Sequence, residues 1–231
     1  MKTWKTSAGT RIIRVLARRS NVFLITNGTR NLLVDTTMPA EWRPLSRRLK
    51  RLGVDHLDGL ILTHAHMDHA GNAARIRETF HPVVMVHRNE ADDLASGATS
   101  VPGGTLAVTR LLVRIISRFA VSIRQFAPCR YDLTVESRFD LHDFGLDAWI
   151  LHTPGHTAGS VSVIVDGEIA LVGDAMFGMI PGSVFPPFAD DPGRMIASWG
   201  RLLDTGCSLF LPAHGSARSR GLLQKEFLRR R

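Results

Sequence analysis

Four side chains that can bind a metal ion lie within six residues of this chain. His64, His66, Asp68 and His69 directly follow the apolar run 59–63. If that run is a buried strand, its period of two places His64 and His66 on one side where the chain leaves the sheet. A catalytic zinc site takes three protein ligands, so four ligands of two donor types are too many for one open site. The cluster predicts a metal site at a strand end and a second metal beside it.

Three further candidate ligands lie beside other apolar, strand-like runs. His156 lies in a Pro-Gly turn between two such runs, while Asp174 and His214 each end one. With these residues in place, the chain resembles the metallo-β-lactamase-fold hydrolases. The similarity is to the full two-metal form of the glyoxalase II and lactonase branches, and its motifs extend from Asp35 to His214.

The resemblance implies two metal sites that share one carboxylate. The ligands implied for the first ion are His64, His66 and His156. Those implied for the second ion are Asp68, His69 and His214. Asp174 would bridge both ions. In relatives the position of Asp35 carries a structural carboxylate or one that supports a ligand, and the alternative is a plain strand-end residue. We expect two zinc ions per chain, although the same donors also suit iron or manganese.

Two closely spaced cations would supply the nucleophile of a hydrolase without a serine or cysteine. Zinc lowers the pKa of its water to about 7, so a metal-bridging hydroxide can attack, while the second ion polarises the carbonyl. Asp68 is the candidate for moving the proton, and the alternative is that it only ligates. Tyr131, whose context does not match the lactonase motif, is a weaker candidate to donate to the oxyanion. We expect the remaining histidines to be surface or hydrogen-bonded core groups: His56, His81, His87, His142 and His152.

Departures from particular branches narrow the expected chemistry to an ester, thioester or lactone carbonyl. Some penicillin-degrading relatives place Cys where Asp174 stands, and others lack that carboxylate. Glyoxalase II proper carries an additional C-terminal helical region, whereas residues 215–231 alone follow His214 here. Iron-dependent persulfide dioxygenases of the same fold share most of the ligands and stay an alternative.

A net charge of +8 raises the alternative of a metal-dependent phosphodiesterase or nuclease. The basic residues recur mostly at helical spacing, which is typical of solvated faces, and no basic patch is interleaved with aromatic residues. Basicity suits anionic substrates and membrane surfaces equally well. We therefore expect a small-molecule substrate in preference to nucleic acid.

Composition favours a single domain over residues 1–231, with a helical insertion at about 88–130. At 44% hydrophobic residues the chain can bury a sizeable core. No signal-peptide core and no apolar run near the roughly 20 residues of a membrane span is found, so we expect a cytoplasmic protein. There, Cys129 and Cys207 would be reduced structural thiols.

A weak internal repeat relates the two halves of the chain. Residues 22–35 and 161–174 each read as strand, turn, strand and Asp, with Asn-Gly and Asp-Gly as tight-hairpin signals. A helix candidate follows each unit, at 40–52 and at 193–203, before another strand that ends in ligands. The pattern predicts two related β-rich half-domains with the site at the rim between them. The family resemblance adds the arrangement, an α/β (α+β) four-layer αββα sandwich.

Two segments bear on the substrate and on partners. The Gly- and Pro-broken loop 175–188 carries three Phe and two Met, which predicts an apolar pocket wall and a substrate with an apolar acyl part. In 105–125, Arg110, Arg114 and Arg118 recur every four residues on an apolar helix candidate. That stripe fits a lid, a homodimer face or peripheral membrane contact. A buried helix with its arginines reaching outwards fits equally well.

Overall fold

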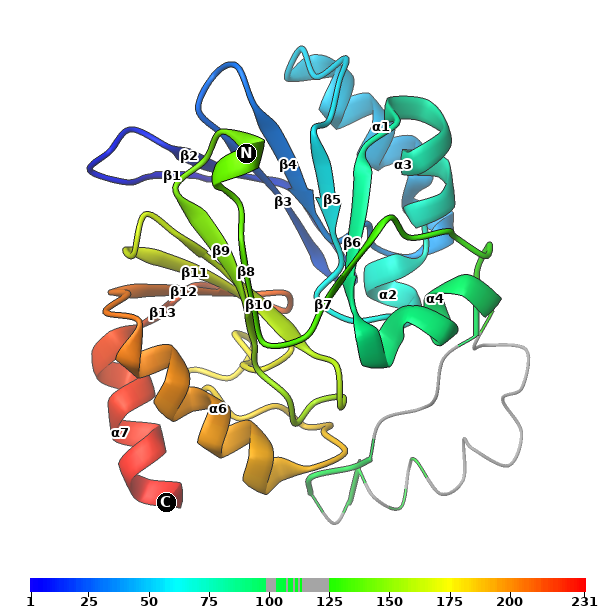
Figure 1. The fold of residues 1–231 in the computed structure, drawn as a ribbon. Coiled ribbons are helices and arrows are strands. Elements are labelled where there is room, and N and C mark those ends of the chain that lie inside the picture. Colours follow the sequence, from blue (N-terminus) through cyan, green and yellow to red (C-terminus); the bar gives the residue numbers. More distant parts are fainter. Residues whose placement is uncertain (99–102, 107, 110, 112, 114–124) are drawn as a thin grey trace.

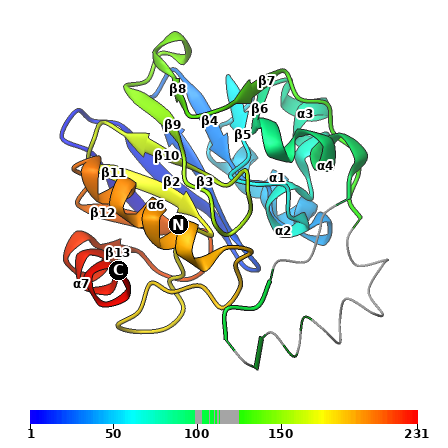
Figure 2. The same ribbon diagram turned by 60° about the horizontal axis from the view of Figure 1, so that its bottom comes forward.

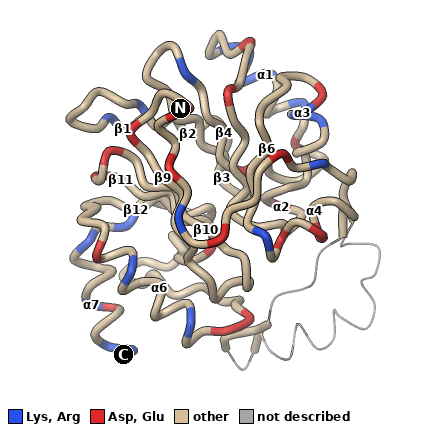
Figure 3. Tube along the Cα trace, in the orientation of Figure 1, with Lys and Arg blue, Asp and Glu red and all other residues tan. Residues whose placement is uncertain are grey.

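The computed structural model describes residues 1–98, 103–106, 108–109, 111, 113 and 125–231 (Figure 1). The arginine stripe predicted at Arg110, Arg114 and Arg118 lies outside the described residues, and its role stays a prediction. Within the described residues, no helix is both long and apolar enough to cross a membrane. Figure 3 shows lysine and arginine on helices of both halves and on connecting loops, interleaved with aspartate and glutamate.

The first half of the chain builds a seven-stranded sheet. Its strands follow one another in chain order: β1 (Thr3–Lys5), β2 (Arg11–Ala17), β3 (Asn21–Thr26), β4 (Asn31–Val34), β5 (Gly59–Ile61), β6 (Val83–His87) and β7 (Leu133–Val135). β1 to β4 pair antiparallel, and β4 to β7 pair parallel. Its helical segments are η1 (Pro39–Glu41), α1 (Trp42–Arg51), α2 (Met67–Ala70), α3 (Ala73–Phe80), η2 (Arg88–Glu90) and α4 (Ala91–Ser96).

The second half builds a six-stranded sheet in the order β13-β12-β11-β10-β9-β8. Its strands are β8 (Arg138–Asp140), β9 (Ala148–His152), β10 (Val161–Val165), β11 (Ile169–Gly173), β12 (Leu209–Pro212) and β13 (Arg218–Ser219). Only β11 and β12 pair parallel among these strands. Its helical segments are η4 (His142–Phe144), α6 (Pro192–Asp204) and α7 (Arg220–Arg230).

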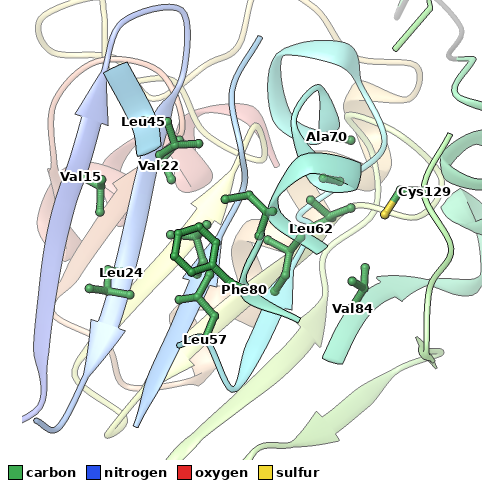
Figure 4. Close-up of a cluster of buried hydrophobic side chains, with 14 of the residues drawn as sticks. Val15, Val22, Leu24, Leu45, Leu57, Leu62, Ala70, Phe80, Val84 and Cys129 are labelled. Atoms are coloured by element: carbon green, nitrogen blue, oxygen red, sulfur yellow. The ribbon is translucent and has the colours of Figure 1, made fainter. Parts of the chain in front are cut away.

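Three apolar cores separate four layers. In β3 every residue is buried, and its side chains alternate: Val22 and Leu24 face the outer core under α1 and α3, while Phe23 and Ile25 face the core between the sheets. Figure 4 shows the first outer core, with Leu45 of α1 packed among the strand side chains. A third core lies under α6 and α7 on the other sheet (Figure 2). The predicted αββα sandwich is confirmed.

The internal repeat is present as shared topology. In each half an antiparallel pair, β3-β4 or β10-β11, continues through a helix into a parallel neighbour, β5 or β12. The second hairpin turns as predicted, because Asp166 and Gly167 both have positive φ, 50° and 65°. The first does not, since Gly28 has φ 103° but Asn27 is not positive. Asn27 instead accepts backbone hydrogen bonds from the two residues before β4, which widens that turn.

The predicted helix starts and free thiols agree with the structure. α6 begins at Pro192, and the Asp191 side chain caps it by accepting from the Arg194 backbone N–H. Cys129 lies in the outer core of the first sheet and Cys207 in that of the second, so the two thiols are unpaired and in different layers.

Candidate metal centre

The structure brings all seven predicted ligands together where strands of both sheets end. His64 and His66 follow β5 at its carboxyl end, and α2 carries the next two ligands. β5 ends at Ile61, so the strand is shorter than the apolar run 59–63 from which it was predicted. His64 therefore lies in the loop that follows the strand. The other three come from the β9–β10 loop, the end of β11 and the end of β12: His156, Asp174 and His214. The ligand atoms form three overlapping groups, each within 4.8 Å.

Three buried imidazoles form the first group. Nε2 of His64 lies 2.9 Å from Nδ1 of His66, and Nε2 of His156 lies 3.1 Å from the same atom. A single proton on Nδ1 of His66 can serve only one of these two neighbours, whereas a metal ion accepts a lone pair from all three. Burial, followed by the adjacent histidines, lowers the pKa of His66 to about 3 and that of His64 well below its ordinary value. His64 and His66 are therefore neutral and can donate a lone pair.

A carboxylate and two imidazoles form the second group. Nε2 of His69 lies 3.8 Å from one Asp68 oxygen, and Nε2 of His214 lies 3.4 Å from the other. Burial lowers the pKa of both histidines, but nearby carboxylates outweigh it and raise the pKa of His69 to about 9 and that of His214 to about 11. The nearby carboxylates therefore favour positive charge at these two rings, carried by protons or by a metal ion.

Asp174 lies between the two groups and presents one oxygen to each. Its Oδ2 is 3.6 Å from Nε2 of His156, while its Oδ1 is 3.6 Å from Nε2 of His69 and 3.3 Å from Nε2 of His214. Despite burial, these histidines hold the pKa of Asp174 well below its usual range. Asp174 Oδ1, His69 Nε2 and His66 Nε2 are buried without a hydrogen-bond partner among the described residues. The first two face each other, as donors to a shared ion would, so the residues present fit two metal ions.

Asp35 contacts a candidate ligand, as predicted. It is 2% exposed, and its Oδ2 accepts from Nδ1 of His69 at 2.9 Å, which leaves Nε2 of that ring free to ligate. Thr63 donates to the same carboxylate through its backbone N–H at 2.9 Å and through its hydroxyl. The Asp35 backbone is left-handed, with φ 62°, a conformation in which Asp and Asn are enriched.

Backbone groups and neighbouring side chains fix the orientation of two more ligands. His156 donates from Nδ1 to the Phe188 carbonyl at 3.0 Å, so its Nε2 carries the lone pair toward His66. Phe177 stacks on His214 with ring centroids 4.7 Å apart. The ligand rings are therefore held before any ion binds.

Sequence reasoning missed one buried carboxylate beside the site. Glu90 is 4% exposed and accepts from the backbone N–H of Ala65 at 2.9 Å and of Gly159 at 3.0 Å. Its only signal in the sequence is its place three residues after His87, which ends a buried strand. That stretch lies at the start of the helical insertion predicted at about 88–130.

The loop 175–188 lines the site less completely than predicted. Met176 is fully buried in the core under α6 and α7, and Phe185 packs edge-on to Trp199 in the same layer. Phe177 does lie at the site, while Met179 and Ile180 beyond it are 65% and 53% exposed. Of the predicted wall, Phe177 contacts a candidate ligand, whereas Met176 and Phe185 belong to the outer core.

Tyr131 and the other histidines lie outside the ligand groups. Tyr131 precedes β7 and so lies at the amino ends of the parallel strands β5, β6 and β7. The ligands follow the carboxyl ends of strands, at the opposite end of the sheet. The oxyanion role considered for it is wrong. His87 and His152 stack on each other at 4.0 Å. The other three are surface groups: His56, His81 and His142.

Comparisons with known proteins agree with this geometry. A family model described as the Metallo-beta-lactamase superfamily matches residues 15–214. The probable metallo-hydrolase MJ0888 of Methanocaldococcus jannaschii is 29% identical over 158 residues, 68% of each chain. The hydroxyacylglutathione hydrolase GloC of Haemophilus influenzae is 31% identical over 179 residues, 76% of each chain. The solved structure of ST1585, an archaeal superfamily protein from Sulfolobus tokodaii, gives a TM-score of 0.65 at 20% identity, covering 96% of this chain and 85% of its own.

Proposed function

The chain belongs to the metallo-beta-lactamase superfamily, and we propose that it is a dinuclear zinc-dependent hydrolase of a carboxylic ester, thioester or lactone. The observation that carries this proposal is Asp174, whose two oxygens face different ligand groups. A carboxylate so placed suits a shared ligand of two ions. The hydroxyacylglutathione hydrolase relative supports a metallo-hydrolase assignment and keeps thioesters among the candidate substrates.

The residues of this chain would divide the catalytic work by their burial and charge. Bound zinc supplies Lewis acidity and lowers the pKa of water to about 7. The Asp68 side chain is 32% exposed, far more than those of His69, Asp174 and His214 beside it. Substrate and solvent can therefore reach Asp68, so we assign it the transfer of the proton to the leaving group in addition to ligation. Asp35 and Phe188 hold the rings that must present a lone pair.

The surroundings of the site support an apolar acyl part in the substrate. Phe177 covers the His214 ring, and Met179 and Ile180 continue from it with most of their side chains exposed. Thr105 donates its backbone N–H to the Pro187 carbonyl, next to Phe188, whose carbonyl accepts from His156. Leu106, which follows Thr105, is 50% exposed. Apolar side chains so near a polar centre suit a ligand that is part acyl chain, part carbonyl.

A substrate screen tests the proposal. Metal-loaded protein would be assayed on lactones, thioesters, esters, β-lactams and phosphodiesters, with chelator-treated protein as the control. We expect hydrolysis of at least one acyl class, rising with the length of an apolar acyl chain and lost on chelation.

Two outcomes would replace the proposal with its alternatives. Cleavage of bis-p-nitrophenyl phosphate and RNA without any acyl hydrolysis would favour a nuclease. Elemental analysis showing one tightly held iron, together with oxygen uptake on persulfides, would favour the dioxygenase.

A further inference from the structure

Glu90 links the loops that carry the three histidines of the first ligand group. We propose that it is a positioning residue that sets the separation of those loops across the two sheets and thereby tunes the affinity for the first ion. This inference rests on the proposed metal centre. Its evidence is the pair of hydrogen bonds made by one carboxylate, the close packing around it and its burial.

The two hydrogen bonds join segments from opposite halves of the chain. Oε2 of Glu90 accepts from the N–H of Ala65 at 2.9 Å, and Ala65 lies between His64 and His66. Oε1 accepts from the N–H of Gly159 at 3.0 Å, three residues after His156. Because a carboxylate is rigid and planar, the two N–H groups are held at a fixed separation, and with them the histidines on either side.

The backbone at residue 159 comes so close to Glu90 that a side chain at this position would displace the Glu90 carboxylate. A side-chain methyl there would lie 2.5 Å from Cγ and 2.7 Å from Oε1 of Glu90. Gly159 has no left-handed φ that would otherwise require glycine. The absence of a side chain at this position is therefore explained by the approach of the carboxylate.

The end of β6 and the turn that follows it contact the end of β9 and the β9–β10 loop at two further points. The His87 ring stacks on His152 with centroids 4.0 Å apart and planes tilted by 23°. Asn89 donates from its side chain to the Ala158 carbonyl at 3.4 Å. Glu90 is thus the inward end of a docked turn and not an isolated contact.

Glu90 is buried without an ion-pair partner among the described residues, since none of the ion pairs there includes it. A buried carboxylate that has only neutral donors destabilises the folded chain relative to one paired with a cation. A cation bound at the adjacent histidines would offset that cost. The position of the charge therefore favours an ion in the first group, in addition to the geometric effect.

The test compares zinc affinities of Glu90→Gln and a matched control. Glutamine keeps the shape but turns an N–H₂ donor toward one of the two backbone donors, so one hydrogen bond is lost. Asp58→Asn is the control, because Asp58 is also a largely buried carboxylate that accepts a backbone N–H, from Asn31 at 2.7 Å, but at the opposite end of β5. Affinity would be measured by competition with a chromophoric zinc chelator, and the geometry by the visible spectrum of the cobalt-substituted protein.

We expect Glu90→Gln to weaken binding of the first ion by about 10–100-fold and to alter the cobalt spectrum, with Asp58→Asn at the wild-type value. Wild-type affinity and spectrum in Glu90→Gln would overturn the inference. If Glu90→Gln does not fold, Gly159→Ala applies the same displacement without removing the charge, and the same two outcomes decide.

Failure of the wild-type protein to bind zinc would refute the proposed function. The role of Glu90 in holding the two loops together can still be measured separately. Amide hydrogen exchange of Ala65 and Gly159 in the metal-free protein reads the two hydrogen bonds directly. Faster exchange at both amides in Glu90→Gln would support the role of Glu90 in holding the two loops together. Unchanged exchange would overturn it.

Discussion

Replacing Asp35 by asparagine should weaken zinc binding at the second ligand group while leaving the fold and the first group intact. Asp35 accepts from Nδ1 of His69 and so directs Nε2 of that ring toward Asp68 and Asp174. Asparagine can still accept from Thr63 with its one oxygen, but its N–H₂ then faces His69. Nδ1 of His69 would have to become the acceptor, which puts the proton on Nε2, the atom that should ligate.

The size of the effect follows from the bond that is lost. A hydrogen bond to a charged group contributes about 1.5–3 kcal/mol. At about 1.4 kcal/mol per factor of ten, this weakens the second ion by roughly 10–100-fold, the range typical of outer partners of metal ligands. Asparagine adds no backbone cost at φ 62°, whereas alanine would add about 1–2 kcal/mol of left-handed strain.

Calorimetric titration of zinc into the metal-free variant would resolve the two binding events. The expected isotherm has an unchanged first event and a weakened second one, and the control Asp58→Asn should match the wild type in both. Unaltered affinity for both ions would refute the role of Asp35 in orienting His69. Loss of both ions together with loss of near-UV circular dichroism would show instead that Asp35 supports the fold.

The remaining predictions concern the bridge, the apolar wall and the thiols. Asp174→Ala should lose both ions and all turnover while keeping its far-UV circular dichroism; retention of one ion at full affinity would contradict a bridging role. Phe177→Ala should raise KM mainly for long-chain acyl substrates. Phe185→Ala should leave KM unchanged and lower the free energy of unfolding, by less than the roughly 3–5 kcal/mol of a fully buried phenylalanine. The opposite pattern would reverse the two assignments. Ellman's reagent at pH 8 should label neither Cys129 nor Cys207 until the chain is unfolded. Both thiols are buried, and burial raises the pKa of Cys129 to about 11. Prompt labelling of the native protein would refute this prediction.

The ligands and the layers could be predicted because they depend on periodic or local signals. An apolar run followed closely by His64 and His66 predicts ligands beyond the carboxyl end of a strand. The repeat of strand, turn, strand and Asp predicts a second copy of the topology. The second hairpin followed from Asp166-Gly167 alone. The division of seven ligands between two ions came from the family resemblance, and the structure places them in groups compatible with it.

Two of the three features that were missed depend on residues distant in sequence. Glu90 contacts the β9–β10 loop only in the folded chain, because its partner Gly159 lies 69 residues away in the sequence. Phe185 was expected at the site by connectivity, but Trp199 offers it a place in the outer core. Asn27 does not adopt the tight-turn geometry, because its side chain accepts hydrogen bonds from the backbone N–H groups two and three residues ahead. Tertiary packing decides the first two, which a single sequence does not display, whereas the Asn27 turn is a local alternative to the tight hairpin.

We propose that acyl hydrolysis requires two ions, held on either side of Asp174. The most direct measurement is the initial rate on the best acyl substrate as zinc is added stepwise to the metal-free protein. The two ligand groups around Asp174 predict that the rate rises until two equivalents per chain are bound and then stops rising. A rate that saturates at one equivalent, or no acyl hydrolysis at any ratio, would contradict the account.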